Sequence, residues 1–329
     1  MPVTLAQAKV AMATPFEQKV VDEFRRESFL MDLLTFDNAV SPGTGGSNLV
    51  YGYTQLKTPA TAQFRDINQE YTPNEAERTD KTVKLKIFGG SYQIDRVIQD
   101  TSGQINEAAF QASQKIKAAA NLFHNTVING DSAVNPLEFD GLNKLLTGTS
   151  TELGTDSILD LTDPTLGKFA LLDALDEFLS ELTDKPTMIM GNSKLINKIK
   201  SQARKAGYMT QSEDAFGRKI DGYDGIPFLD LGYFATVSGG TASTRPIVDN
   251  VSREIGGNPV TGLTDLYAVS LGLDGFHGVT PTGGNAGIRA YLPNFNTPGV
   301  VKTGDVEMVA GVALKATRKA GVLRNIKVL

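Results

Sequence analysis

The sequence contains no cysteine, no tryptophan and only two histidines in 329 residues. Without cysteine the chain can form no disulfide, no thiolate nucleophile and no Cys-ligated zinc or iron–sulfur centre. Two histidines leave little for a His-based metal site. No apolar run approaches the ~20 residues of a membrane-spanning helix, and no basic segment followed by an apolar one opens the sequence, so we expect neither a membrane span nor a signal peptide. We therefore expect a protein that acts inside a cell, or in a particle assembled there.

An excess of basic charge is also lacking. The 32 basic residues face 37 acidic ones, a net charge of −5, so no basic field is available to drive tight nucleic-acid binding. What is present is the composition of a folded protein, with 40% hydrophobic and 21% charged residues. A chain of this length is expected to form one to three compact units.

The N-terminal region predicts an arm. Residues 1–14 are small and polar, and residues 15–34 predict an amphipathic helix with Phe16, Val20 and Phe24 near one face. A helix at a chain end needs a surface to lie on, either on the same chain or on a neighbouring copy. A flexible, glycine-rich loop is expected at 41–48.

A long β-hairpin is expected next. Residues 48–56 are rich in aromatic and branched side chains, and residues 82–88 alternate, with Val83, Leu85 and Ile87 opposite two lysines. The polar, charged segment 58–81 between them is too long for a compact domain to carry without a use. A two-stranded projection explains it, and because a lone hairpin is marginally stable in water, we expect another subunit to pack on it.

The apolar pattern predicts a long helix from 103 to 128. Thr101 and Gln104 form a capping-box pattern at its start, and Asn129-Gly130 ends it. At 1.5 Å per residue it is about 39 Å long. Its Ala-rich apolar stripe, which would let a neighbouring element approach closely, consists of Ile105, Ala109, Ala112, Ile116, Ala119, Phe123 and Val127.

The second half of the chain predicts an α/β part with short strands. One helix is expected from Asp163-Pro164 to just before Pro186, and another from Ser193 to Ala206, ended by Gly207. Short strands are expected at 187–190, 226–231, 265–273, 288–292, 306–314 and 326–329.

Motifs for nucleotide binding and catalysis are weak. No Gly-x4-Gly-Lys-Ser/Thr pattern occurs. An Ala-x-Ser-x-Gly pattern around Ser270 is followed by Asp274 and His277, but all three lie within eight positions, whereas a hydrolase triad draws its members from separate loops. We interpret the segment as a strand that runs into a glycine-rich turn.

The other candidate residues favour structural roles. His124 is expected at the edge of the long helix with a local hydrogen bond. Residues 221–225 are expected to form a turn, because the spacing and the closing Glu of a calcium loop are missing. We predict no catalytic, cofactor-binding or metal-binding residue and no enzymatic activity. The arm and the charged hairpin both need partners, which favours an assembly subunit.

The order of these elements resembles the major capsid proteins of tailed double-stranded DNA bacteriophages, which have the HK97-like fold. Six segments carry the resemblance over nearly the whole chain. They are QKVVDEFRRESFLMDLL (18–34), similar to the N-arm; 48–88, similar to the extended E-loop, with its charged tip near 73–78; 101–130, similar to the spine helix; NGDSAVNPLEFDGL (129–142); 187–208 with 222–232, similar to the entry into the axial domain; and 306–329, similar to the returning strands.

The resemblance implies an α+β, HK97-like capsid fold with five parts. These are an N-terminal arm at 1–40, an E-loop hairpin at 41–90, a peripheral (P) domain at 91–185 with its spine helix at about 103–128, an axial (A) domain at 186–292, and strands that return to the P domain at 293–329.

The implied function is structural. Such subunits form hexamers and pentamers of an icosahedral shell that encloses the viral DNA without sequence-specific binding, and the E-loop lies across the neighbouring subunit. The expected location is the virion capsid, assembled in the host cytoplasm without a membrane. Only ~40 residues precede the E-loop, fewer than a built-in scaffolding domain needs. We therefore expect a separate scaffolding protein, together with a portal and a decoration protein.

The resemblance also suggests contact residues. We predict that Arg65, Glu75, Glu77 and Arg78 make ion pairs between subunits. Some members of the family cross-link an E-loop lysine to an asparagine of a neighbour with a glutamate as base. Lys57 and Asn325 lie in comparable regions, but no Glu follows Asn325, so we do not expect the cross-link.

Two alternatives stay open. An encapsulin, a bacterial protein compartment that holds cargo, has the same fold, and folding arguments cannot separate it from a phage capsid. The arm and the long E-loop favour the phage. The other alternative is a hydrolase-like enzyme that uses Ser270 or His277.

Overall fold

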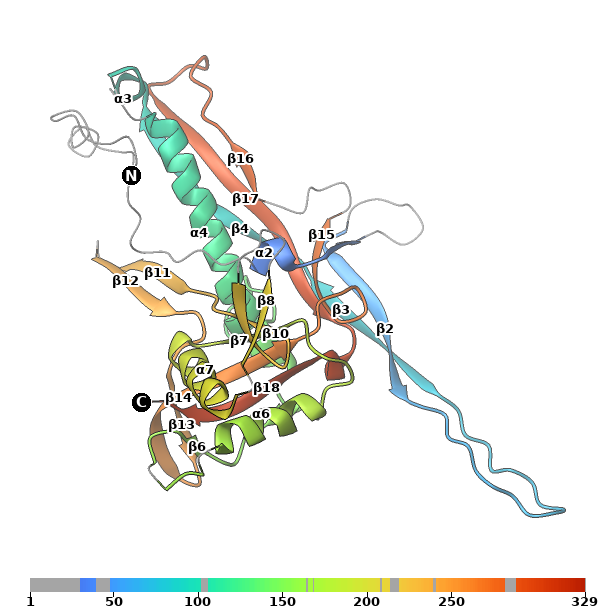
Figure 1. Cartoon of the computed structure of the whole chain (residues 1–329). Coiled ribbons are helices and arrows are strands. Elements are labelled where there is room, and N and C mark those ends of the chain that lie inside the picture. Colours follow the sequence, from blue (N-terminus) through green and yellow to red (C-terminus); the bar gives the residue numbers. More distant parts are fainter. Residues whose placement is uncertain are drawn as a thin grey trace.

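A long helix, a long twisted ribbon, a compact mixed sheet and a projecting hairpin make up the computed structural model (Figure 1). The structure describes residues 30–39, 48–101, 106–163, 165–167, 169–207, 209–213, 219–238, 241–281 and 288–328. Of the expected N-terminal helix, only α2 (Leu30–Leu33) lies within these ranges. The rest of the expected arm, and the expected loop at 41–47, lie outside the described residues.

Two long strands form the elongated part. β4 (Lys86–Asp95) pairs antiparallel with β17 (Val301–Leu314), and α4 (Glu107–Asn129) lies along this ribbon (Figure 1). The same sheet contains β1 (Phe36–Ala39), β15 (Phe276–Pro281) and β16 (Arg289–Tyr291), in the order β1-β15-β17-β16 with β4 on β17. β17 begins earlier than the strand expected at 306 because its first part, residues 301–310, pairs with β4.

The compact part is a mixed sheet in the order β5-β18-β14-β7-β10-β9-β8, with β13 on β14 and β6 on β18. Its strands are β5 (Glu152–Leu153), β6 (Leu159–Asp160), β7 (Met188–Gly191), β8 (Met209–Glu213), β9 (Lys219–Tyr223), β10 (Ile226–Leu229), β13 (Val251–Ile255), β14 (Asn258–Val269) and β18 (Ala320–Lys327). A separate hairpin joins β11 (Tyr233–Ser238) to β12 (Thr241–Pro246). Two short turns of helix, α5 (Leu142–Leu145) and η1 (Thr317–Lys319), are also present.

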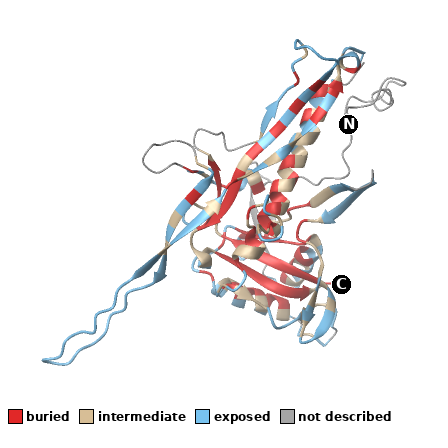
Figure 2. Ribbon diagram, turned by 180° about the vertical axis from the view of Figure 1, so that it is seen from behind, coloured by how far each residue is buried: buried red, intermediate tan, exposed pale blue. Residues whose placement is uncertain are grey.

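The central strands of the mixed sheet, β7, β18 and the second half of β14, are buried on both faces (Figure 2). Alternate side chains of a strand point to opposite faces. Met188 and Met190 of β7 therefore pack in a cluster with Phe123 of α4, whereas Ile189 packs in a second cluster with α6 (Ala170–Ser180) and α7 (Ser193–Ala206). A strand covered on both sides is apolar along its length, which is why 187–190 is predicted well from sequence.

The long helix begins later than its sequence pattern predicts. Its N-cap is Asn106, whose side-chain oxygen accepts a hydrogen bond from the N–H of Ala109 at 3.1 Å. Thr101 instead ends a short helix, α3 (Arg96–Thr101), where its hydroxyl donates to the carbonyl of Val97 at 2.6 Å. The expected capping box is thus wrong, because a second helix uses Thr101. The expected end is confirmed, since the N–H of Gly130 bonds to Thr126.

The apolar stripe of α4 is buried only in part. Ala112, Ala119, Phe123 and Val127 are buried, as predicted. Ala109 is exposed and Ile116 is 37% exposed. The ribbon packs along one side of the helix (Figure 1). Ile105 and Gln104 lie outside the described residues.

The helix expected from Asp163 starts only at Ala170. The Asp163 carboxylate accepts hydrogen bonds from the N–H and the hydroxyl of Thr165 at 2.8 and 2.7 Å, so it closes a local turn rather than capping the helix. The next helix, α7, is confirmed from Ser193 to Ala206. It ends on Gly207 at φ 81°, a conformation that favours glycine.

The single strand expected at 82–88 is divided. β3 (Glu77–Lys84) belongs to the projecting hairpin, and β4 begins at Lys86 in the ribbon. The chain changes partners at Leu85, which is buried and bonds through its N–H to Leu49 at 2.8 Å. Ile87, expected on the same side as Leu85, is 63% exposed. The predicted alternation therefore fails beyond Leu85.

Candidate functional site

The projecting hairpin makes little contact with the rest of the described chain beyond its base. β2 (Val50–Thr58) pairs antiparallel with β3, from Val50 opposite Lys84 to Thr58 opposite Glu77. Residues 59–76, which we call the hairpin tip, continue beyond the last pair without strand structure, and every one is exposed (Figures 1 and 2). The expected two-stranded projection is present, and its outer half has no packing partner among the described residues.

The four predicted contact residues all lie on this hairpin and are exposed. Glu77 pairs with Lys57 on the opposite strand at 2.9 Å. The Arg65 guanidinium donates to the carbonyl of Gln69 at 3.3 Å and lies 5.3 Å from the ring centre of Tyr71. Glu75 and Arg78 have no ion-pair partner among the described residues. Their role between subunits stays a proposal.

Sequence reasoning missed the apolar residues of the tip. Phe64 is fully exposed, Ile67 is 84% exposed, and Tyr71 is also exposed. Single exposed apolar residues are common on protein surfaces, but a short loop that presents three of them indicates a contact site. The signal was visible in the segment QFRDINQEY (63–71), where large apolar side chains interrupt a polar loop.

The base of the hairpin is fixed to the body by polar contacts. The Tyr51 hydroxyl donates to the Asp37 carboxylate at 2.6 Å, and the Tyr53 hydroxyl donates to the carbonyl of Leu314 at 3.0 Å. The hydrogen bond from Tyr51 lowers the pKa of Asp37, and burial is the first cause that raises the pKa of Tyr51. The hairpin is therefore anchored at its base and bare at its tip.

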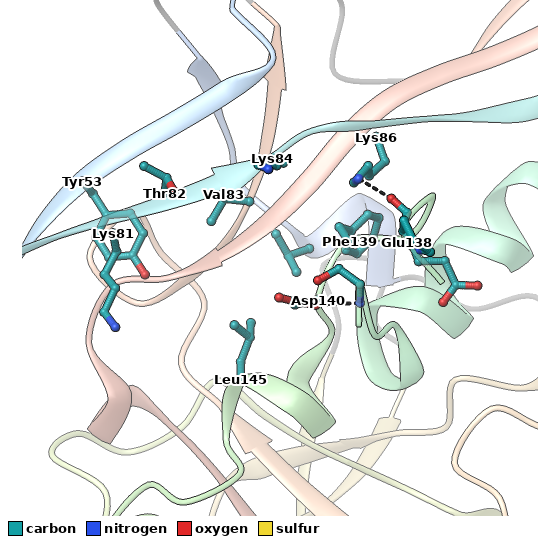
Figure 3. Close-up of a pocket in the computed structure, with 13 residues that line it drawn as sticks. Tyr53, Lys81, Thr82, Val83, Lys84, Lys86, Glu138, Phe139, Asp140 and Leu145 are labelled. Carbon is teal, nitrogen blue, oxygen red and sulfur yellow. Dashed lines mark hydrogen bonds between the residues drawn. The ribbon is translucent and has the colours of Figure 1, made fainter. Parts of the chain in front are cut away.

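A cleft of about 400 Å³ opens beside this base; we call it the root cleft (Figure 3). Figure 3 shows Tyr53, Lys81 and Val83 of the hairpin strands on one side of it. The opposite side is formed by the loop that follows α4 (130–141). The complete lining is Tyr53, Lys81, Thr82, Val83, Lys84, Lys86, Ser132, Pro136, Glu138, Phe139, Asp140, Leu145 and Val312.

The hydrolase candidates do not form a hydrogen-bonded triad. Asp274 forms an ion pair with Lys319. His277 is fully buried, its Nδ1 lies 3.3 Å from the carbonyl oxygen of Gly275, and burial lowers its pKa. The Ser270 hydroxyl is buried and has no hydrogen-bond partner among the described residues. Among the described residues no hydrogen bond joins any two of these three side chains, in agreement with the interpretation as a strand that runs into a turn.

The environment of His124 differs from the expected one. It is 4% exposed instead of lying at the helix edge, and its Nε2 has no hydrogen-bond partner in the part of the chain that the structure describes. Burial lowers its pKa to about 4. The turn expected at 221–225 is confirmed only at Asp224 and Gly225, which lie at φ 48° and 73° between β9 and β10, whereas residues 221–223 belong to β9. Within the described residues no group of three or more His, Asp or Glu side chains could hold a metal ion.

The two residues weighed for a cross-link have different environments. Lys57 is exposed on the hairpin, where it pairs with Glu77. Asn325 is 2% exposed, and its amide donates to the carbonyls of Gly154 and Thr155 at 2.8 and 2.9 Å. A neighbouring chain would have to displace these bonds to reach Asn325.

A buried ion-pair network holds the compact part together. Arg324 pairs with Glu152 at 2.7 Å and with Asp265 at 3.0 Å, and Arg253 pairs with Asp265 from the other side. These residues are distant in sequence, so no local pattern revealed the network. Its charges are all satisfied within the chain, which makes it a structural feature rather than a candidate site.

No family model matches the sequence, and no curated protein matches it. Solved structures do match over almost the full chain. The SrpI encapsulin from Synechococcus elongatus PCC 7942 aligns with a TM-score of 0.63 at 13% identity, covering 100% of this chain and 97% of the encapsulin. The capsid of Myoviridae phage XM1 aligns with a TM-score of 0.56 at 11% identity, covering 98% of each chain.

A third structure, the capsid of a native GTA particle, aligns with a TM-score of 0.54 at 12% identity, covering 98% of this chain and 99% of that one. No helix among the described residues is long and apolar enough to cross a membrane. The matches are to shell proteins, and they extend over the spine helix, the ribbon, the compact sheet and the hairpin together. The chain therefore has the α+β, HK97-like fold that capsid and encapsulin subunits share.

Proposed function

We propose that this chain is the major capsid protein of a tailed double-stranded DNA bacteriophage. Its copies form the hexamers and pentamers of an icosahedral shell around the viral DNA. The observation that carries the proposal is the hairpin, whose tip is entirely exposed and carries apolar side chains. A two-stranded hairpin is marginal by itself in water, and a neighbouring subunit supplies the missing surface.

The proposal assigns a mechanical role to each described part. The ribbon and α4 form a stiff P domain, and the compact sheet forms the A domain that meets its copies at the centre of a capsomer. The hairpin crosses to the neighbour and ties subunits together. With a net charge of −5, the shell contains DNA without gripping it. No step requires catalysis. A separate scaffolding protein, a portal and a decoration protein complete the particle, which assembles in the host cytoplasm.

The domain limits follow the same proposal. We place the arm at 1–40, the E-loop at 41–90, the P domain at 91–185 and the A domain at 186–292, with 293–329 returning to the P domain. Rigid-body rotation of these parts during maturation would adjust the interfaces without unfolding any of them.

Electron microscopy tests the function directly. The chain is taken from its native particle or co-expressed with the genes beside its own. Closed shells of uniform diameter are expected, with DNA inside native particles. A discrete monomer or dimer from the native source would overturn the proposal and return attention to Ser270 and His277.

An encapsulin is the second candidate, because the TM-score of 0.63 to the SrpI encapsulin exceeds the 0.56 and 0.54 of the two capsids named above. The contents of the particle distinguish the two. Packaged double-stranded DNA supports the phage capsid, whereas shells that hold a cargo protein and no DNA support the encapsulin. The long hairpin tip favours the phage, since it suits a large shell whose subunits reach far across one another.

A further inference from the structure

The hairpin tip has a defined chemical character. Arg65 is its one basic residue and Asp66, Glu70 and Glu75 are its three acidic ones, so its net charge is −2. Arg65 is occupied within the tip by two backbone carbonyls and the Tyr71 ring. The exposed surface of the tip is therefore acidic, with the large apolar side chains of Phe64 and Ile67 beside the acids.

The root cleft has the complementary character. Lys81, Lys84 and Lys86 line it. The Lys86 ammonium donates to the carbonyl of Pro136 at 2.5 Å. Lys81 and Lys84 are exposed and have no ion-pair partner among the described residues.

Two acids of the opposite wall, Glu138 and Asp140, offset the three lysines only in part, so positive charge is in excess in the lining. Asp140 already pairs with Lys144 at 3.0 Å, and Glu138 accepts from the amide of Asn135 at 2.9 Å. The same loop presents Val134 and Leu137, which are 83% and 79% exposed. The root cleft thus offers unpaired positive charge beside exposed apolar surface.

The size and position of the root cleft are also suited to receive the hairpin tip of a second copy. A volume of about 400 Å³ lies in the range of pockets that admit a small ligand, so it can admit an aromatic side chain. The tip cannot reach the cleft of its own chain, because the hairpin extends straight away from its base (Figures 1 and 2). Only a second copy can bring a tip to this cleft.

We infer that the acidic, apolar hairpin tip of one copy docks in the lysine-lined root cleft of the next copy. This inference rests on the proposed shell function and deepens it by naming both sides of one contact. The contact is head-to-tail, since each copy gives a tip and receives one. Head-to-tail contacts close into rings when the rotation allows, as a capsomer requires. Phe64 and Ile67 supply apolar burial, while Glu70 and Glu75 face Lys81 and Lys84.

Cysteine pairs test the contact in assembled particles, because the chain has no cysteine of its own. The variant carries Ile67→Cys and Lys84→Cys and is oxidised after assembly. The expected result is loss of the monomer band and a ladder of covalent multimers on a non-reducing gel. Matched controls are each single variant and the pair Ile67→Cys with Ser243→Cys, since Ser243 is exposed on β12 away from the hairpin. These should give no ladder.

The outcomes separate this inference from the function. Parent and variant particles of normal appearance without a ladder would overturn the inference and leave the shell function standing. A product that stops at the dimer would also overturn it, because a symmetric contact does not propagate. Absence of particles from the parent itself, under native conditions, would overturn both. A second pair, Phe64→Cys with Glu138→Cys, tests the same contact at other positions, in case the two sulfur atoms of the first pair are too far apart to bond.

Charge reversal gives an independent test. Lys81→Glu with Lys84→Glu should make particles fall apart at lower salt than the parent, because like charges then meet in the contact. Adding Glu70→Lys and Glu75→Lys should restore the parent's salt tolerance. Unchanged particle stability together with loss of packaged DNA would overturn the inference and assign the lysines to nucleic acid.

Discussion

Two phenylalanines of this chain, Phe123 and Phe64, have opposite surroundings. The Phe123 ring is fully buried, with the rings of Phe88 and Phe139 at centroid distances of 5.9 and 5.8 Å. The Phe64 ring is fully exposed at the far end of the hairpin. Burying a phenylalanine side chain is worth about 1.5–3 kcal/mol. The body obtains this free energy when the chain folds, whereas the tip can obtain it only when two chains meet.

The largest expected effects come from truncating each phenylalanine, because one variant should affect the stability of the subunit and the other its assembly. Phe123→Ala leaves a cavity beside the rings of Phe36, Phe88 and Phe139 and should lower the free energy of unfolding of the unassembled subunit by about 3–5 kcal/mol. Phe64→Ala should change it by less than about 0.5 kcal/mol yet reduce the yield of closed particles. Urea unfolding and electron microscopy measure the two quantities. A large loss of subunit stability in Phe64→Ala would show that the tip packs on its own body.

The body should also lose stability in acid where the hairpin does not, because both histidines lie in the body. Burial lowers the pKa of His124 from 6.5 to about 4, so the unfolded chain binds a proton that the folded chain resists. Stability is complete above pH 6.5 and declines as the pH falls to about 4, by about 3 kcal/mol for this group.

Thermal unfolding of the unassembled subunit between pH 7 and pH 4 measures this decline. His124→Leu should make the unfolding temperature depend less on pH. The double variant His124→Leu with His277→Leu should depend on pH still less, because burial lowers the pKa of His277 as well. Equal pH dependence in the parent and the double variant would contradict the assignment.

Contacts at the base of the hairpin should contribute less to stability than the buried body and more than the exposed tip. Tyr51→Phe removes the hydroxyl that donates to Asp37 at 2.6 Å, a loss of about 1 kcal/mol for a partly exposed hydrogen bond. Hydrogen exchange should become faster in β2 and β3 and stay unchanged in α4. Tyr71→Phe in the tip is the matched control, and it should leave exchange unchanged in both regions.

The smallest effect is expected from a single exposed charge. Arg78→Glu should leave subunit stability unchanged and weaken the assembled particle, since an exposed ion pair contributes about 0.2–1 kcal/mol. The effect should shrink in high salt. Particle stability at low and high salt is the measurement, and a variant identical to the parent at low salt would remove Arg78 from the interface.

Local signals in the sequence were sufficient where a segment determines its own structure. α7 is predicted from Ser193 to Ala206 because its N-cap, apolar face and final glycine all lie within the segment. The hairpin and the end of α4 are predicted for the same reason. The order of such elements suggested the fold, which the solved shell structures match at full length.

Prediction failed where a distant partner decides the structure. The division at Leu85 depends on β17, which pairs with β4 from more than two hundred positions away. The ion pairs of Arg324 with Glu152 and Asp265 join three separate strands or loops. The candidate site shows the same limit: the sequence located the hairpin and its charges, but only the structure showed which side chains are free and where the root cleft lies.

The bare tip has a consequence for the fate of subunits that never assemble. Exposed segments without secondary structure are preferred sites of proteolytic cleavage, and residues 59–76 form such a segment with Arg65 in its middle. A free chain would be cut there first, whereas a tip seated on a neighbour would be shielded. The segment that joins copies together would then also mark unassembled copies for turnover, so the population of intact chains would be enriched in assembled ones.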